Sequence, residues 1–449
     1  MTSLPALLHR PDSQAPRGRD RRTFASLSIH NYRIYFTGAL VSNIGTWMGR
    51  VSQDWLVLTE LTDHDSTALG IVTALQFAPV VLLAPWAGAL ADRFRKRRIL
   101  FGTQTALAVT SAILAAVTLA GVVQLWHVYL LALLQGIATA ADNPTRQAFV
   151  SEMVPQDRIS NAVGLNSASF NAARLIGPGF AGLLIAWIGT GWTLVFNTVS
   201  FVSVLVALKV MRGSELQKPP LSKGHGGIRA GLAYVRHRPD IMLIMAIVFM
   251  LGTFGMNFQI TTALMATTVF GKGAGEFGLL GSIMAVGSLS AALMSAGRSR
   301  PRLRTLLLAL TGFTVASAAA ALAPSYPLFA LFLVPVGLTA LTVLPTANSM
   351  VQLSVAPEMR GRVMALYMAI FMGGTPLGAP LIGWVGSEYG ARWTILVGSI
   401  ATGLTVVGAT IYLMRRDDIR FRYEWDRGPH LNVLRPRDRV QALTPEQVR

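Results

Sequence analysis

Two charged residues of opposite sign stand four positions apart inside one of the most apolar stretches of the chain. They are Arg50 and Asp54, within the run WMGRVSQDWLVL at residues 47–58. A separation of four places both side chains on one face of a helix. Such a pair can form an intrahelical ion pair that stabilises packing, or its carboxylate can take up and release a proton beside the cation.

Two more charged residues, Asp142 and Arg174, lie well inside apolar segments. A charge inside a bilayer is costly unless it is paired or hydrated, so each such residue suggests a functional site. Asp142 has Arg146 four residues further on and can form a second intrahelical pair. Arg174 has no acid in its own segment and needs a carboxylate, backbone carbonyls, water or an anionic substrate. Asp54, Arg50, Asp142 and Arg174 have a formal charge sum of zero, and we predict them as proton-coupling candidates.

The segments around these residues indicate the class of protein. The chain has 449 residues, of which 52% are hydrophobic and 13% charged. A helix of about 20 apolar residues crosses the roughly 30 Å hydrocarbon layer of a membrane. We therefore expect an all-α polytopic membrane protein with twelve transmembrane helices in two six-helix halves. The spans are expected near residues 31–58, 67–91, 98–121, 125–149, 160–187, 190–211, 240–268, 275–297, 303–323, 326–350, 361–386 and 391–414.

The basic residues are distributed very unevenly over these spans. With an even number of spans both termini lie on one side, and that side carries all but four of the 39 Lys and Arg residues. This is the positive-inside pattern, which predicts cytoplasmic termini and a location in the cytoplasmic (inner) membrane. Topology thus accounts for the net charge of +18, and we expect no nucleic-acid partner.

The longest polar interruption divides the chain into two similar halves. We expect a cytoplasmic N-terminal segment (1–30), a six-helix half (31–211), a cytoplasmic central loop (212–238), a second six-helix half (239–414) and a cytoplasmic tail (415–449). The segment from residue 151 aligns without gaps to a segment about 202 residues later, with Pro155 matching Pro357 and Pro178 matching Pro380. Such repeats enclose a binding cavity near the middle of the membrane in transporters.

Enzyme chemistry finds little support in the sequence. There is no cysteine, which excludes disulfides and thiol catalysis. The common protease, hydrolase and phosphate-binding motifs are absent as well. We expect no catalytic residue, no metal site and no cofactor.

Two short motifs point to a transporter. The loop GALADRFRKRRIL at residues 88–100 resembles the G-x-x-x-D-R-x-G-R-R signature of the major facilitator superfamily, with Arg95 where that family has Gly. The run ARLIGPGFAGLLI at residues 173–185 resembles the antiporter signature of the same superfamily. The resemblance implies the major facilitator fold. It assigns a gating loop to Gly88, Asp92, Arg93 and Arg97, and an antiporter motif to Gly177, Pro178 and Gly182.

A wider likeness covers about residues 24–414. NYRIYFTGALVSNIGTWM and DNPTRQAFVSEMVPQDRISNAVGLNSASFNAARLIGP resemble the enterobactin-exporter-like branch, the third drug:proton antiporter group. This resemblance implies a monomer that exports a small lipophilic, drug-like or siderophore-like molecule by proton antiport. A proton-coupled uptake permease, and a lipid-flipping or sensory protein without proton coupling, remain alternatives. The polar residues expected in the cavity are Gln53, Asn166, Asn171, Asn257 and Gln259, although interhelical hydrogen bonds explain each of them equally well.

Overall fold

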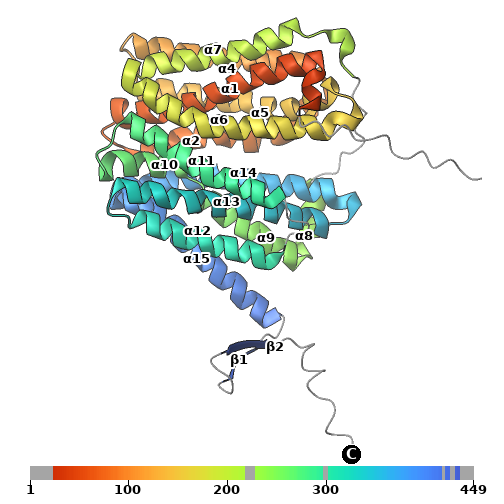
Figure 1. Cartoon of the computed structure of the whole chain (residues 1–449), viewed down its shortest axis with the longest axis vertical. Helices are drawn as coiled ribbons and strands as arrows, with labels where there is room; N and C mark the ends of the chain where they lie inside the picture. Colours follow the sequence, from red (N-terminus) through yellow and green to blue (C-terminus); the bar gives the residue numbers. More distant parts are fainter. Residues whose placement is uncertain (1–23, 218–227, 297–301, 417–419, 425–429, 435–449) are drawn as a thin grey trace, which may run out of the picture.

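The computed structural model describes residues 24–217, 228–296, 302–416, 420–424 and 430–434. Within these residues the chain forms a bundle of long helices in two halves, which lie one above the other in Figure 1. The first half contains α1 (His30–Trp55), α2 (Ser66–Leu82), α3 (Ala84–Arg93), α4 (Lys96–Leu119), α5 (Leu125–Met153), α6 (Ile159–Ile188) and α7 (Thr190–Val210). After the short α8 (Ile228–Arg236), the second half contains α9 (Pro239–Met250), α10 (Phe258–Leu264), α11 (Ala274–Ala296), α12 (Leu303–Ala321), α13 (Tyr326–Ser354), α14 (Pro357–Tyr389) and α15 (Ala391–Arg416).

All twelve expected spans are helical, and two of them are interrupted. The second span breaks at Leu83 into α2 and α3, and the seventh consists of α9 and α10 joined by the π-helical turn Leu251–Gly255. Among the described residues, nine helical segments are long and apolar enough to cross a membrane. The other three spans fall short because α2 has only 17 residues and because α1 and α5 carry many polar residues. The number of twelve crossings therefore stays a prediction.

The two halves use one packing pattern. In the first half α1 packs on α6 and α7, α4 on α5 and α7, and α2 on α5. The corresponding helices of the second half make the same contacts: α9 packs on α14 and α15, α12 on α13 and α15, and α11 on α13. This agreement is what an internal duplication produces.

Glycine turns occur at matching places in both halves. Gly189, between α6 and α7, has a φ of 84°, and Gly390, between α14 and α15, has a φ of 92°. Both values lie in a region that residues with a Cβ atom rarely adopt. Each glycine lets the chain reverse direction within one residue, and so places two consecutive spans side by side.

The bundle has two chemically distinct ends. At one end lie Arg93–Arg98, Arg158 and Arg212, and we call it the basic end. At the other end lie the turns at Gly121, Gly189, Gly271 and Gly390, and we call it the opposite end. In Figure 1 the label of α8 marks the basic end, on the right, and that of α10 the opposite end.

The halves contact each other mainly along two helix pairs, α2 with α14 and α6 with α11, and α10 adds smaller contacts with α1 and α2. At the opposite end the Ser66 hydroxyl donates to the Gly383 carbonyl at 2.6 Å, and the hydroxyls of Thr67 and Ser387 lie 2.9 Å apart. Near mid-depth Ser282 of α11 accepts a hydrogen bond from the Gly179 amide at 3.1 Å. All hydrogen bonds between the halves that join described residues lie at mid-depth or towards the opposite end, so this end is closed.

Ionic and capping contacts hold the basic end of the first half together. Lys96 and Glu152 form a nearly buried ion pair of 2.7 Å between α4 and α5. Arg97 donates to the Leu208 carbonyl at 2.8 Å and so satisfies a free acceptor at the end of α7. Asn31 exchanges two hydrogen bonds of 2.9 Å with the backbone of Arg212. These contacts hold the basic end of the first half together without any residue of the second half.

The tail contains a short two-stranded hairpin. Two short strands, β1 (Arg420–Glu424) and β2 (His430–Leu434), pair antiparallel with Arg420 opposite Leu434. They follow α15 and are the only strands within the described part of the chain.

The contact between α6 and α11 leads to a first prediction. A Cβ atom at Gly182 would collide with the Ala274 carbonyl oxygen and lie 3.0 Å from that of Gly275, and backbone atoms cannot move aside easily. We expect Gly182→Ala to lower the apparent melting temperature by several degrees, since overpacking costs about 1–3 kcal/mol. Gly164→Ala is the matched control on the same helix, because nothing lies within 4 Å of its Cβ position. Equal melting temperatures for the two variants would contradict this packing.

Candidate functional site

A cavity of about 660 Å³ lies against the first half of the bundle. Its walls come from α1, α2, α4, α5, α6 and α7, and Met372 of α14 is the single lining residue from the second half among the described residues. The lining extends from Gln53, in the deeper part, to Val150 and Val163, near the basic end. With the opposite end closed, this cavity extends towards the basic end.

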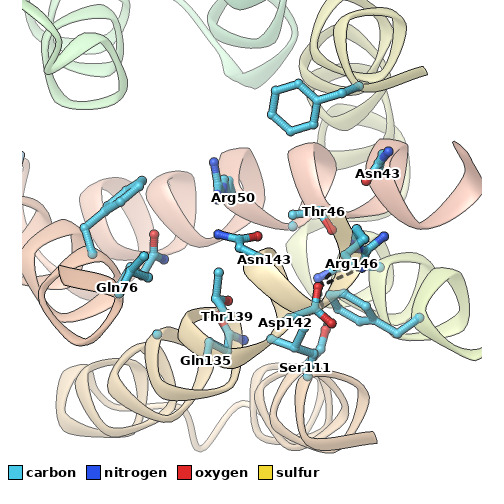
Figure 2. A pocket seen from close by; sticks show the side chains of 18 of the residues that line it. Asn43, Thr46, Arg50, Gln76, Ser111, Gln135, Thr139, Asp142, Asn143 and Arg146 are labelled. Carbon is cyan, nitrogen blue, oxygen red and sulfur yellow. Dashed lines mark hydrogen bonds and ion pairs between the residues drawn. The ribbon is translucent and has the colours of Figure 1, made fainter. Parts of the chain in front are cut away.

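Two polar stripes dominate the cavity wall. On α5, Gln135, Thr139, Asn143 and Gln147 follow one another at intervals of four residues. On α1, Asn43, Thr46, Arg50 and Gln53 follow at intervals of three or four. Figure 2 shows labelled members of both stripes on the two sides of the cavity. Helical spacing of polar residues in apolar helices is a sequence signal, and it could have identified Asn43, Thr46, Gln135, Thr139, Asn143 and Gln147, which the sequence-based prediction omitted.

Asp142 is fully engaged in hydrogen bonds. One of its oxygens accepts from Thr103 and Gln104 of α4, each at 2.8 Å. The other accepts two bonds from Arg146, at 3.0 and 2.9 Å, drawn as dashed lines in Figure 2. Asp142 is 4% exposed. A buried carboxylate with four donors and a bidentate arginine is a structural link between α4 and α5.

Asp54 has the opposite environment. It is 3% exposed, and its Oδ2 atom has no hydrogen-bond partner. The spacing of Arg50 and Asp54 allows an intrahelical ion pair. The described part of the structure does not form this pair. Instead the Arg50 guanidinium lies over two rings, 5.0 Å from the centroid of Trp47 and 5.6 Å from that of Phe77. Asp54 is thus a buried acid close to a cation but not bonded to it.

Arg174 of α6 shares the Trp47 ring with Arg50. Its guanidinium carbon lies 5.7 Å from the ring centroid, and the two cations are close enough to repel one another. Arg174 forms no hydrogen bond or ion pair with any described residue. The ring itself is fixed, because Gly177 of α6 packs directly against the Cβ atom of Trp47 and Phe170 packs edge-on at 6.0 Å.

The predicted antiporter motif occupies a junction between three helices. Gly177 faces α1, whereas the Pro178 carbonyl and Gly182 face Gly278 and Ala274 of α11. The lack of side chains at these glycines allows the close approach that membrane helices use for association. The motif therefore couples the position of Trp47 to the contact that closes the opposite end.

The predicted gating loop lies at the basic end, away from the cavity. Arg93 is exposed and lies 5.9 Å from the Phe94 ring centroid, and Arg97 caps α7 as described above. Gly88 has open space around its Cβ position. The side chain of Asp92 lies outside the described part of the structure. The gating role of these four residues stays a prediction.

The predicted polar cavity residues divide between the halves. Gln53, Asn166 and Asn171 line the cavity. Asn257 and Gln259 belong to the second half and do not line it; Asn257 is buried and donates to the Thr253 carbonyl at 2.7 Å. Asn257 thus supports the interrupted α9–α10 segment, because its side chain satisfies a carbonyl that the broken helix leaves free.

This arrangement can bind a small polar molecule between the two stripes and can exchange a proton at a buried carboxylate.

Comparison with known proteins places the chain among membrane transporters. The family model of transmembrane secretion effectors matches residues 21–426. The multidrug efflux pump Tap of Mycolicibacterium fortuitum is 27% identical over 377 residues, which covers 81% of this chain and 90% of the pump. The staphyloferrin A transporter of Staphylococcus aureus is 26% identical over 265 residues, covering 58% of this chain and 66% of that protein, just under two thirds.

The fold is also found in solved structures. The crystal structure of the nucleoside transporter NupG aligns with a TM-score of 0.67 at 14% identity, over 85% of this chain and 98% of that one. At this identity the likeness concerns the fold alone. Together with the family match, it identifies the chain as a multi-pass membrane protein of the transmembrane secretion effector family, within the major facilitator superfamily.

Proposed function

We propose that the protein exports a small molecule across the cytoplasmic membrane by proton antiport, with Asp54 as the proton carrier. The observation that carries this proposal is the buried Asp54 carboxylate, which has an unpartnered oxygen beside the cavity residue Arg50. A relative described as a multidrug efflux pump supports the direction of transport.

The positive-inside pattern supports a cytoplasmic position for the basic end. With the opposite end closed, the cavity then extends towards the cytoplasm, which is the state in which an exporter loads its cargo. Alternating access requires the contacts of α2 with α14 and of α6 with α11 to open while the basic end closes. The small residues at these contacts make separation of the helices inexpensive, because few side chains must repack.

The two buried acids support different roles. Asp142 holds four hydrogen bonds, so protonation there would disrupt the link between α4 and α5. Asp54 has no such bonds to lose, and its neighbour Arg50 can move between the aromatic rings and the carboxylate. Protonation of Asp54 therefore changes the charge balance at the cavity without dismantling the bundle. Arg50 then acts as the partner that senses this charge.

Everted membrane vesicles test the coupling. Respiration acidifies the lumen of such vesicles, and an exporter then accumulates cargo while protons leave, as a pH probe in the lumen reports. With cargo chosen from drugs and carboxylate siderophores by thermal-shift screening, we expect accumulation by the unaltered protein. We expect Asp54→Asn to reduce accumulation to the level of vesicles without the protein, because Asn cannot carry a proton.

The control for this experiment is Asp63→Asn. This change removes the same charge from an exposed side chain in the loop between α1 and α2, at the opposite end of the bundle. It should leave accumulation unchanged. Full proton-driven accumulation by Asp54→Asn would contradict the proposal, and cargo loss from the acidified lumen would support an uptake permease instead.

The contrast between the acids gives a separate prediction. Asp142→Asn leaves the partly buried Arg146 without its carboxylate, and breaking a buried pair costs about 3 kcal/mol or more. We expect a lower melting temperature for this variant, measured by intrinsic fluorescence, and no such loss for Asp54→Asn. The control is Asp157→Asn, since Asp157 is 78% exposed and 4.0 Å from its partner Arg158. Similar melting temperatures for Asp142→Asn and Asp157→Asn would show that the network is not structural.

A further inference from the structure

Among the described residues, three charges in the membrane-spanning part lack a bonded partner. Arg146 neutralises Asp142, which removes that acid from the balance. Arg50, Asp54 and Arg174 remain, with a formal sum of +1 rather than the zero expected from sequence. Neither arginine forms a hydrogen bond or an ion pair with any described residue. We call these three residues the cluster. One further negative charge would bring its formal charge to zero.

Arg50 and Arg174 lie against the same aromatic ring, and we call this pair of arginines the clamp. Their guanidinium carbons lie 5.0 and 5.7 Å from the centroid of the same Trp47 ring. Both side chains keep partial exposure, whereas Asp54 is almost completely buried. Arg50 lines the cavity and Asp54 does not, so an anion in the cavity meets Arg50 before it meets the acid.

The contacts with aromatic rings do not complete this site. A cation over a ring gains only about 0.5–2 kcal/mol, which is less than the cost of withdrawing a guanidinium from water. The planar guanidinium fork instead matches the two oxygens of a carboxylate or phosphate. The two cations around one fixed ring are therefore suited to bind an oxyanion.

The cavity wall next to Arg50 indicates which chemical groups the rest of the ligand carries. Arg50 belongs to the polar stripe of α1, and it faces the amide-rich stripe of α5 across the cavity (Figure 2). Amide side chains both donate and accept hydrogen bonds, so they suit hydroxyl and carbonyl groups. A purely lipophilic cargo would leave these groups unsatisfied.

We propose that Arg50 and Arg174 bind a carboxylate of the transported molecule, and that this molecule is a polar organic acid. This inference rests on the proposed function in one respect, namely that the cargo enters this cavity. One bound carboxylate brings the charge of the cluster to zero while Asp54 is ionised.

Equilibrium binding of radiolabelled citrate to the protein in lipid nanodiscs tests the clamp. We expect saturable binding, and weakening of about tenfold or more in Arg50→Gln and in Arg174→Gln, as for a lost hydrogen bond between charged groups. Arg33→Gln is the matched control, since Arg33 is an exposed arginine on the same helix as Arg50. Wild-type affinity in both clamp variants, or equal weakening in Arg33→Gln, would overturn the proposal.

Two competitors define the chemistry. Triethyl citrate has the same skeleton without the charges, and it should not displace the label. Inorganic phosphate should compete only at much higher concentration, because it lacks the groups that contact the amide stripe. Displacement by either compound at the concentration of unlabelled citrate would overturn the assignment to an organic carboxylate.

Thermal stability separates binding from a structural role. An arginine that holds the fold together should destabilise the empty protein when it is replaced. The clamp predicts instead that Arg50→Gln and Arg174→Gln melt no lower than wild type without citrate, because an unpaired buried charge has been removed, and that citrate no longer raises their melting temperature. Lower melting temperatures without citrate in both variants would overturn the clamp.

Asp54→Asn distinguishes this inference from the proposed function. It removes the carboxylate but leaves both arginines, so citrate should still bind although proton coupling is lost. Binding without proton-driven transport supports both proposals. Proton coupling that survives in Asp54→Asn defeats the proposed function and leaves the citrate result standing, whereas absent citrate binding in a proton-coupled wild type defeats only the clamp.

Discussion

The cost of an unpaired charge in an apolar helix bundle is the constraint on which the rest of this structure depends. Most charges near the bundle satisfy it visibly: Lys96 pairs with Glu152, Arg97 binds the end of α7, and Asp142 is enclosed by four donors. Arg50, Asp54 and Arg174 do not. Stability alone favours removing such charges, and the proposed transport role accounts for their presence near a polar cavity.

Small residues link this cluster to the movement of the protein. On one side α6 fixes the Trp47 ring through Gly177, and on another it meets α11 through Pro178 and Gly182. Separation of α6 from α11, which alternating access requires, therefore acts on the helix that also carries Arg174. Helix α6 thus links the two events directly: a change of charge at the cluster, and a change of contact at the opposite end.

Much of this was accessible from sequence, because the bilayer imposes strong regularities. Span positions followed from apolar length, and Arg50 and Asp54 stood out as charges in an apolar run. What escaped prediction depends on how helices face each other. The sequence could not tell that Arg146 binds Asp142 while Arg50 turns to Trp47, since both pairs have the same spacing. It also suggested Asn257 as a cavity residue, whereas the interruption between α9 and α10 uses that side chain internally.

The central claim is that the unpaired charges form the site at which cargo and proton meet. A cryo-electron microscopy structure of the protein in nanodiscs with bound citrate, at a pH where Asp54 is ionised, tests it most directly. The account predicts ligand density within hydrogen-bonding distance of both Arg50 and Arg174, beside the Trp47 ring. Density elsewhere in the cavity, together with a direct Arg50–Asp54 ion pair and an Arg174 bonded to protein groups, would contradict it.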